Sequence, residues 1–542
     1  MESTDEQQTL QLLSEATRDI ERMNGQINRL QSSLERITQK RDHLQKRVSA
    51  LRRRITPIPT EILQHIFGFC LEAYPVISSS SLDEAPILLT RVCSRWRSVV
   101  LDTPGLWSAM HIAMPSRDTF AFTAKYNRIQ RIMDEFINRS GSLPLHISVY
   151  FRAYPHPAEA SESDSELLHI LQSLAMHSKR WKTLHLDLPV QCFTLAMSRL
   201  TSGDVPLLET AVFAGQSIDF LSDAQSLRQL ALEGHFNSLA PLPLDGSMWS
   251  KLQVLKLHVF FGSDMPGLFS VLGVCQDLRE CILDLSFLHE PMNGVPPVNG
   301  TLVLPYLKTL RLIDPVRNDA LAGVLDRLTL PALEVLDTRT SIYFFRIEQE
   351  TLSCLASLLE RSTCSLTELS FVARDSPALT SAQLMEFLRH TCLHTSLRKL
   401  TMNCRADFGY YTENGPWANF VDDDLLQALA VVSSAETALC PNLTRLEFTD
   451  GCCISESALL DLISARMHQN GTPGAVKPLK RLLVYTRKHG FASSFDSDDL
   501  NVEGVQVIEE VDLTRRSFDI PTYSRDPKES YGPFSRDVII DY

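Results

Sequence analysis

The sequence has little that would suit a secreted, membrane or metal-binding protein. No segment approaches the roughly 18–20 uninterrupted apolar residues that a membrane-spanning helix needs. The first 25 residues are polar and acidic, unlike a secretory signal or a transit peptide. Twelve cysteines are scattered over 542 residues without any Cys-x-x-Cys pair, so neither a zinc site nor a disulfide framework is predicted. We expect reduced, mostly buried thiols in a cytoplasmic or nuclear protein.

The motifs of common enzyme active sites are also missing. The sequence has no P-loop, no dinucleotide-binding glycine turn, no Gly-x-Ser-x-Gly and no His-Glu-x-x-His. Asp496, Asp498 and Asp499 form a spaced acidic cluster, but Asn501 stands where a calcium-binding loop needs glycine. The sequence therefore predicts no enzyme, no cofactor and no metal site.

The charge is acidic overall but unevenly spread. Lys and Arg number 52 against 65 Asp and Glu, a net charge of −13, which disfavours general binding to nucleic acid. Residues 36–54 hold eight Lys or Arg against one Asp, a local +7, so the remainder carries −13 − 7 = −20. This basic stretch is either a solvated helix face or a nuclear-localisation or nucleic-acid patch.

Residues 1–55 predict one long helix, because neither a proline nor a glycine pair interrupts them. Apolar residues recur at alternating steps of three and four at eleven of twelve seam positions, which is typical of a coiled coil. The seam comprises Leu13, Ala16, Ile20, Met23, Ile27, Leu30, Leu34, Ile37, Arg41, Leu44, Val48 and Leu51. We expect a homodimer through this helix; a helix packed on its own protein is the alternative. Arg47 would face Arg52 in a parallel dimer, so charge does not settle the strand orientation.

Residues 56–107 predict three short helices whose apolar side chains exceed what about fifty residues can bury alone. This segment resembles the F-box, the adaptor-binding module of cullin-RING ubiquitin ligases. The resemblance rests on three stretches, which are Ile58-Pro59-Thr60-Glu61-Ile62-Leu63-Gln64-His65-Ile66-Phe67, Val92-Cys93-Ser94-Arg95-Trp96 and Pro104-Gly105-Leu106-Trp107. Ile58 replaces the usual leucine. With the coiled coil before it and leucine-rich repeats after it, the arrangement is similar to the F-box families abundant in mushroom-forming fungi.

The resemblance implies a set of residues that contact a Skp-type adaptor and, through it, a cullin. They are Ile58, Pro59, Ile62, Leu63, Ile66, Phe67, Val92, Trp96, Leu106 and Trp107. It also implies that Val92, Trp96 and Trp107 are shared between the adaptor and the core of the module. Packing in the core alone is the alternative for Trp96.

From about residue 171 to residue 514 a repeat of the form apolar-x-x-apolar-x-apolar predicts one short strand per unit. Twelve units run from WKTLHL at Trp181 to IEEVDL at Ile508, at steps of 19 to 46 residues with helix-like stretches between them. This pattern resembles a leucine-rich repeat. The asparagine or cysteine that stitches regular repeats is missing, so we predict an irregular solenoid. Another α/β sheet fold is the alternative.

The remaining segments complete an α/β chain of five parts. Residues 108–170 predict a connector with a helix over about 118–139 and a strand over 143–151. Residues 515–542 form a tail that predicts a capping, interaction or disordered segment. The five predicted parts are thus 1–55, 56–107, 108–170, 171–514 and 515–542.

The last variable residue of each repeat unit should lie on the concave face of the sheet. This column runs from His185 to Asp512 and mixes charged, polar and apolar residues, which favours a protein partner. Its predicted substrate-contacting members are His185, Lys256, Arg311, Asp337 and Glu447; plain solvent exposure is the alternative for each. The sequence thus predicts a non-enzymatic substrate receptor of a cullin-RING ligase, or else a ligase-independent repeat scaffold.

Overall fold

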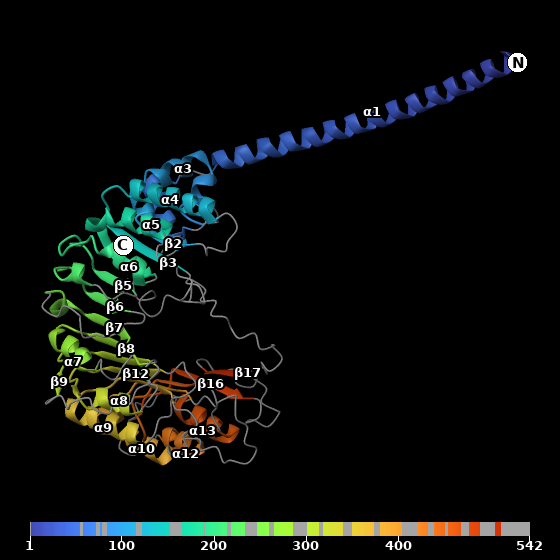
Figure 1. Cartoon of the computed structure of the whole chain (residues 1–542). Helices are drawn as coiled ribbons and strands as arrows, with labels where there is room; N and C mark the ends of the chain where they lie inside the picture. The colour runs from blue at the N-terminus through green and yellow to red at the C-terminus, as the bar shows by residue number, and fades with distance from the viewer. Residues whose placement is uncertain are drawn as a thin grey trace. The chain divides into compact units, whose positions relative to one another are not determined.

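A computed structural model of the chain gives the arrangement of its helices and strands (Figure 1). The residues that it describes are 2–54, 58–71, 76–77, 84–114, 122–151, 165–188, 190–213, 218–232, 247–258, 265–285, 301–313, 318–339, 349–372, 380–403, 421–431, 438–449, 454–467, 476–487 and 505–510. The predicted tail 515–542 lies outside these residues. Two compact units form: Met1–Ala73 with Leu82–Leu106, and Tyr74–Ser81 with Trp107–Tyr542.

The first unit contains the predicted long helix and the short helices that follow it. Helix α1 runs from Glu2 to Arg54 without interruption, which confirms the prediction of a single helix over residues 1–55. The shorter elements are α2 (Thr60–Phe69), the 3₁₀ turn η2 (Leu88–Arg91), α3 (Ser94–Leu101) and the 3₁₀ turn η3 (Pro104–Trp107), the last of which ends in the second unit.

A small core joins α2 to α3. Leu63 and Phe67 are one helical turn apart and both buried, and the Phe67 ring meets the edge of Trp96 with 4.9 Å between ring centroids. The Gln64 side-chain amide donates to Thr103 Oγ1 at 3.1 Å, which fixes the end of α3 against α2. The ring contact and this hydrogen bond join residues that are about 30 to 40 positions apart in the sequence. They make the short helices one module.

Apolar residues from Leu88 to Val100 have the spacing of one continuous helix, but the structure divides this stretch into η2 and α3. Cys93 is extended (φ −160°, ψ 169°) and caps α3, with its sulfur accepting from the Trp96 N–H at 3.5 Å. The extended cap ends η2 and starts a new helix, because an N-cap residue leaves helical backbone angles to satisfy the first N–H groups. Apolar spacing alone did not indicate this break.

The second unit is built on one parallel sheet. Fifteen of its described strands lie side by side in sequence order. They are β1 (Val76–Ile77), β2 (Ala109–Met114), β3 (Leu145–Phe151), β4 (Trp181–Asp187), β5 (Thr210–Phe213), β6 (Gln229–Leu232), β7 (Val254–His258), β8 (Glu280–Asp284), β10 (Thr309–Ile313), β12 (Val335–Arg339), β13 (Glu368–Val372), β14 (Lys399–Asn403), β15 (Arg445–Thr449), β16 (Arg481–Arg487) and β17 (Val505–Glu510). A two-stranded sheet of β9 (Leu302–Val303) and β11 (Leu328–Thr329) accompanies it.

Helices follow most of the strands, which gives the strand–loop–helix succession of a solenoid. The described helices are α4 (Phe122–Arg139), α5 (Ser165–Ala175), α6 (Val190–Met197), α7 (Met265–Val274), α8 (Asn318–Leu325), α9 (Gln349–Ser362), α10 (Ser381–Leu388), α11 (Thr391–His394), α12 (Asp423–Ala430) and α13 (Glu456–Met467). In Figure 1 the helices from α7 to α13 lie along one face of the sheet. The opposite face, which no described helix covers, is called the concave face below.

The repeats predicted from the sequence are confirmed as strands from the first unit to the eleventh. Each begins with a leucine or Trp181 that is at most 4% exposed, and at the two later positions every side chain that the structure describes is buried, Thr338 among them. The segment 108–170, predicted as a connector, is different: its β2 pairs with β3, and β3 pairs with β4 in the same sheet. Their alternating pattern is less leucine-rich, so the repeat search missed them.

The last repeat lies six residues before its predicted position. Strand β17 spans Val505 to Glu510 and pairs Leu482 with Val505 and Val484 with Val507. The repeat is therefore VEGVQV from Val502, and Gln506 takes the column position predicted for Asp512, which lies outside the described residues. Two adjacent matches occur in this stretch, VEGVQV from Val502 and IEEVDL from Ile508, and only pairing with β16 chooses between them.

Backbone groups join one repeat to the next. In the units from the second to the tenth, the residue after the first leucine offers its carbonyl to two successive N–H groups of the following unit; for example, Lys308 O accepts from Glu334 and Val335, both at 2.9 Å. The same double acceptance recurs at Glu209, Arg228, Gln253, Arg279, Glu334, Thr367, Arg398 and Thr444. A backbone junction needs no particular side chain, which explains how the solenoid forms without an asparagine ladder.

A side chain also links neighbouring segments by hydrogen bonds. Arg466 of α13 is fully buried and donates to the carbonyls of Leu429, Leu443 and Lys477 at 3.0 to 3.1 Å. Burial lowers the pKa of this guanidinium to about 10, so it stays charged at neutral pH. One cation thus satisfies three carbonyls of neighbouring segments.

Candidate protein-interaction surfaces

Helix α2 presents a second apolar face, beside the one that it buries. Ile58, just before the helix, and Ile62, Ile66 and Phe69 follow one another at steps of four, four and three, so they share one side. Their exposed fractions are 37, 50, 39 and 79%. Leu88 of η2 and Val92, which directly follows η2, are exposed as well, at 42 and 52%. These six residues are called the α2 surface below.

The residues that the F-box resemblance assigned to an adaptor divide between the surface and the core. Ile58, Pro59, Ile62, Ile66 and Val92 are exposed, and Trp96 is half-buried. Leu63, Phe67, Leu106 and Trp107 are buried, at 3% exposure or less, so they do not reach a partner in this arrangement.

Trp107 has a packing role within the second unit. Its ring meets the edge of Phe136 in α4, with centroids 4.9 Å apart, and the Arg139 guanidinium lies 5.3 Å above it. A buried ring held by an aromatic edge and a cation stabilises α4 on the start of the repeats. The expectation that Trp107 is shared with an adaptor is thus not met by this placement.

Phe69 and Leu88 belong to the α2 surface but were missed in the sequence. Phe69 is three residues after Ile66, a spacing that puts it on the same helical face, so periodicity over α2 would have found it. Leu88 is different, because it lies on η2 and not on α2, so the spacing along α2 does not indicate it.

Helix α1 exposes its seam over its described side chains. Leu13, Ile20, Ile27, Leu34 and Val48 are each 48 to 68% exposed, and so are Met23, Leu30, Ile37 and Leu44, at 49 to 69%. Exposed apolar positions recurring along so many turns cost free energy unless another helix covers them.

The predicted substrate-contacting column lies on the sheet as the repeat implied. Register pairs His185 with Val212, Ala231 with Lys256, Arg311 with Asp337, and Thr401 with Glu447. His185 and Lys256 are half-buried, and the side chains of Arg311 and Glu447 are 23 and 16% exposed.

Asp337 corrects one expectation, because it is only 4% exposed and so is not an open surface residue. A short side chain on a sheet has neighbours about 4.8 Å away on each side, and longer groups cover it. Val212, Ala231, Ile282 and Leu483 of the same column are also buried. The column is therefore not continuously exposed.

An ion pair and a histidine–carboxylate contact join neighbouring strands at this face. Arg311 Nε lies 3.5 Å from Glu280 Oε1, and His258 Nε2 lies 3.4 Å from Asp284 Oδ2. Both contacts are partly shielded from water. The charge of Arg311 in the column is thus partly balanced inside the chain by Glu280.

Two histidines near the start of the sheet are kept neutral. Burial, and then the nearby His185, lowers the pKa of His111 to about 4; burial, and then Lys182, lowers that of His146 to about 4. Each pairs with a hydroxyl at 2.9 Å, His111 Nδ1 with Ser148 Oγ and His146 Nδ1 with Thr183 Oγ1. They act as neutral hydrogen-bonding groups between strands.

Among the described residues, no group of three or more His, Cys, Asp or Glu is placed to hold a metal ion. No helix in the described part of the chain is long and apolar enough to cross a membrane.

Comparison with known proteins gives no family. No protein-family model and no curated protein matches the sequence. Among solved structures, the chain is similar to a protein from Bacteroides fragilis, with 11% identity, 64% of this chain and 83% of that chain covered, and a TM-score of 0.31. It is also similar to an internalin from Listeria monocytogenes, with 12% identity, coverage of 66 and 87%, and a TM-score of 0.28. The assignment of a repeat solenoid rests on this chain's own strands and junctions.

Proposed function

We propose that this chain is a substrate-recognition subunit of a cullin-RING ubiquitin ligase. In this proposal the first unit binds a Skp-type adaptor, and the repeats bind a protein substrate. The chain itself carries out no reaction and needs no cofactor. It holds the substrate near the conjugating enzyme, which raises the effective concentration of a substrate lysine. Such a complex operates in the cytoplasm or the nucleus.

The observation that carries the proposal is the α2 surface. The same short module that resembles an F-box in sequence leaves four apolar side chains, Ile58, Ile62, Ile66 and Phe69, on one helix face. Apolar residues gathered on a small module indicate a protein contact, because solvent exposure of such a group is unfavourable. The matching adaptor would cover this face and leave Leu63 and Phe67 in the core of the module.

In this proposal the substrate binds to the concave face. His185, Lys256, Arg311 and Glu447 supply polar groups along it, while buried neighbours keep the sheet rigid. A rigid surface with groups of both signs suits a folded or extended protein partner. Helix α1 would join two copies of the chain along its seam and bring two substrate sites into one complex.

A ligase-independent repeat scaffold is the second candidate function. It is favoured by the repeats alone, since stacked strands of this kind present long interaction surfaces whatever the N-terminal module binds. In that case the α2 surface contacts an adaptor without cullin, or another protein.

Adaptor binding is tested with the full-length chain and an immobilised Skp-type adaptor in complex with cullin. Ile62→Asp with Ile66→Asp places two charges on the α2 surface without altering its core, so we expect binding to fall by at least about tenfold. Met176→Asp with Leu195→Asp is the matched control, because both residues are exposed apolar side chains elsewhere. Failure of the unaltered chain to bind the complex contradicts the ligase function, and binding of adaptor alone favours the scaffold.

A further inference from the structure

Five cationic residues from three separate segments lie where strands β14, β15 and β16 begin. Register sets Lys399 beside Arg445 and Arg445 beside Arg481, and Arg398 and Lys480 directly precede their strands. We call these five residues the basic cluster. The segments that supply them are about 46 and 36 residues apart in the sequence, so the sequence pattern does not show the cluster.

The basic cluster is accessible. Arg398, Arg445, Lys480 and Arg481 are exposed, and the Lys399 side chain is 32% exposed. Lys399, Arg445 and Arg481 alternate with the buried Leu400, Leu446 and Leu482, which places them on the concave face.

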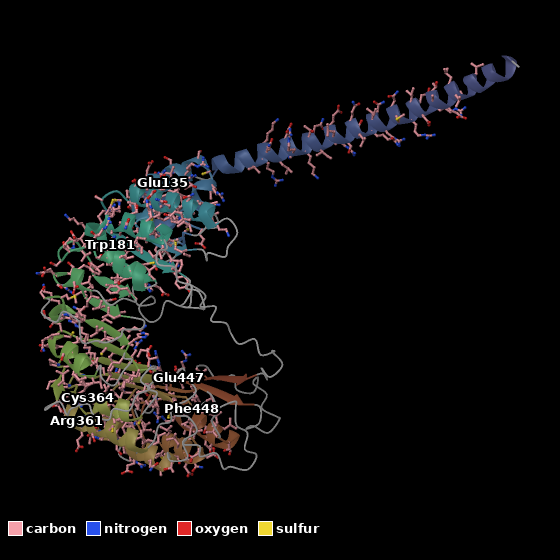
Figure 2. The ribbon with its side chains drawn as sticks, viewed as in Figure 1. Glu135, Trp181, Arg361, Cys364, Glu447 and Phe448 are labelled. Atoms are coloured by element: carbon pink, nitrogen blue, oxygen red, sulfur yellow. The ribbon has the colours of Figure 1, made fainter. Side chains whose placement is uncertain are left out.

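One carboxylate lies within the basic cluster. Glu447 Oε2 is 4.0 Å from Lys399 Nζ, and Glu447 Oε1 is 3.8 Å from Arg481 Nε. Its other contact is a hydrogen bond from Thr401 Oγ1 at 3.3 Å. Figure 2 labels Glu447 and the next residue, Phe448, whose side chain points to the opposite, buried side of β15.

The charges do not balance. Five cations and Glu447 sum to +4, or to +3 when Glu368 on the neighbouring strand is included, whereas the rest of the chain then carries −13 − 4 = −17. Like charges directly opposite each other on adjacent strands, about 4.8 Å apart, destabilise a sheet. The gathered arginines and lysines are thus an unfavourable arrangement for the isolated chain and a favourable one for binding an anion.

We propose that the basic cluster binds a short acidic segment of a partner polypeptide, rich in Asp or Glu. Arginine forks match carboxylates in two parallel hydrogen bonds, and three strands give a strip about 10 Å wide, which suits a few residues in extended form. In the substrate-receptor proposal that segment belongs to the substrate, and only this identification rests on the proposed function.

The alternative ligand, a nucleic acid, fits the surroundings less well. A long polyanion would run off the basic cluster onto a chain that is otherwise strongly acidic. Among the side chains described on β14 to β16, the one aromatic ring is Phe448, which is buried and offers no face for stacking a base.

Binding is measured on the full-length chain by fluorescence anisotropy with a labelled peptide containing six glutamates. The peptide with six glutamines is the neutral reference, and a single-stranded RNA of equal charge is the rival ligand. We expect the glutamate peptide to bind, to weaken as salt rises, and to lose at least about tenfold in affinity on Arg445→Glu with Arg481→Glu. Arg445→Lys with Arg481→Lys keeps the charge and should retain most of the binding.

The control has the same charge change elsewhere. Arg279→Glu with Arg389→Glu alters two exposed arginines outside the basic cluster, and we expect less than a twofold change. Equal binding of the two peptides, equal loss in both glutamate variants, or tighter binding of RNA than of the peptide would overturn the proposal. Adaptor binding by the same preparations is scored separately, so failure here is distinct from failure of the ligase function.

Discussion

Neighbouring residues of α2 have opposite environments, and a single step of about 100° around the helix decides which. Ile62 is half-exposed and Leu63 is 2% exposed, although both are branched aliphatic side chains in the same turn. A charge at Ile62 therefore tests a contact with a partner, whereas a charge at Leu63 would disrupt the packing of Phe67 and Trp96. Substitutions at these two neighbouring positions thus test binding and stability separately.

The burial of His111 predicts how the free energy of unfolding depends on pH. The pKa of His111 is about 4 in the native chain, below its ordinary value of 6.5, so the unfolded chain binds more protons between these values. The free energy of unfolding should therefore be greatest above about pH 6.5 and fall as the pH is lowered towards 4, by about 1 kcal/mol per pH unit between 6 and 5 from His111 alone.

The measurement is urea unfolding at pH 7, 6 and 5, for the natural chain and for His111→Asn. The variant should lose about 1 kcal/mol of the pH-dependent change from 6 to 5, since asparagine has no proton to gain. His146, with a similarly lowered pKa, is retained in both proteins and cancels in the comparison. Identical pH dependence in the two proteins would contradict a neutral, buried His111.

At the scale of elements, α1 is a helix that its own unit does not cover. Its 53 residues span about 80 Å at 1.5 Å per residue, and its described seam positions are exposed throughout. A strict 3–4 seam is narrower than the stripe that a helix uses to pack on a globular core. A second copy of the same helix is the partner whose seam matches it in length and chemistry.

Dimerisation through α1 is tested by Leu30→Asp with Leu34→Asp, two adjacent seam positions. We expect this variant to be a monomer at micromolar concentration, because two buried charges in a seam are strongly unfavourable. Light scattering coupled to size exclusion gives the mass. Ser32→Asp with Gln39→Asp adds the same charge on the outer side of the helix and should remain dimeric; a monomeric natural chain would refute the dimer.

At the scale of the molecule, the second unit is stabilised by contacts between successive repeats. Each strand pairs with the one before and the one after it, and the junction carbonyls link the same neighbours. Stability is then approximately a sum over repeats and their interfaces, and damage stays near its origin. Irregular repeat lengths are tolerated because the loops and helices between strands can vary while the junctions stay the same.

Local damage is predicted for Leu307→Ala. Leu307 is fully buried at the start of the unit that contains β10, and truncating a buried leucine costs about 2–5 kcal/mol. Hydrogen exchange should rise in β8, β10 and β12 and stay unchanged in β2 and β3. Lys308→Ala next to it removes only an exposed ion pair with Glu334, keeps the junction carbonyl, and should alter exchange little. A uniform rise over all strands would contradict the nearest-neighbour account.

The sequence by itself determined much of the chain's organisation. The long helix, the connector helix and eleven successive strands follow from apolar spacing, because periods of 3.5 or 3.6 and of 2 are set by local backbone geometry. The same spacing put Ile62, Leu63, Ile66 and Phe67 on one apolar stripe of α2. It did not separate the two exposed isoleucines from the two buried residues. In each case the apolar spacing predicts a pattern within a single helix or strand.

The tertiary structure decided what lies between elements. It placed β2 and β3 in the sheet, moved the last repeat to Val505, buried Trp107 against Phe136, and enclosed Asp337. It also brought Lys399, Arg445 and Arg481 into one row. The physical reason is that strand register, burial and the meeting of distant charges depend on which segments pair in space, and the pairing energy is spread over many residues that are far apart in the chain.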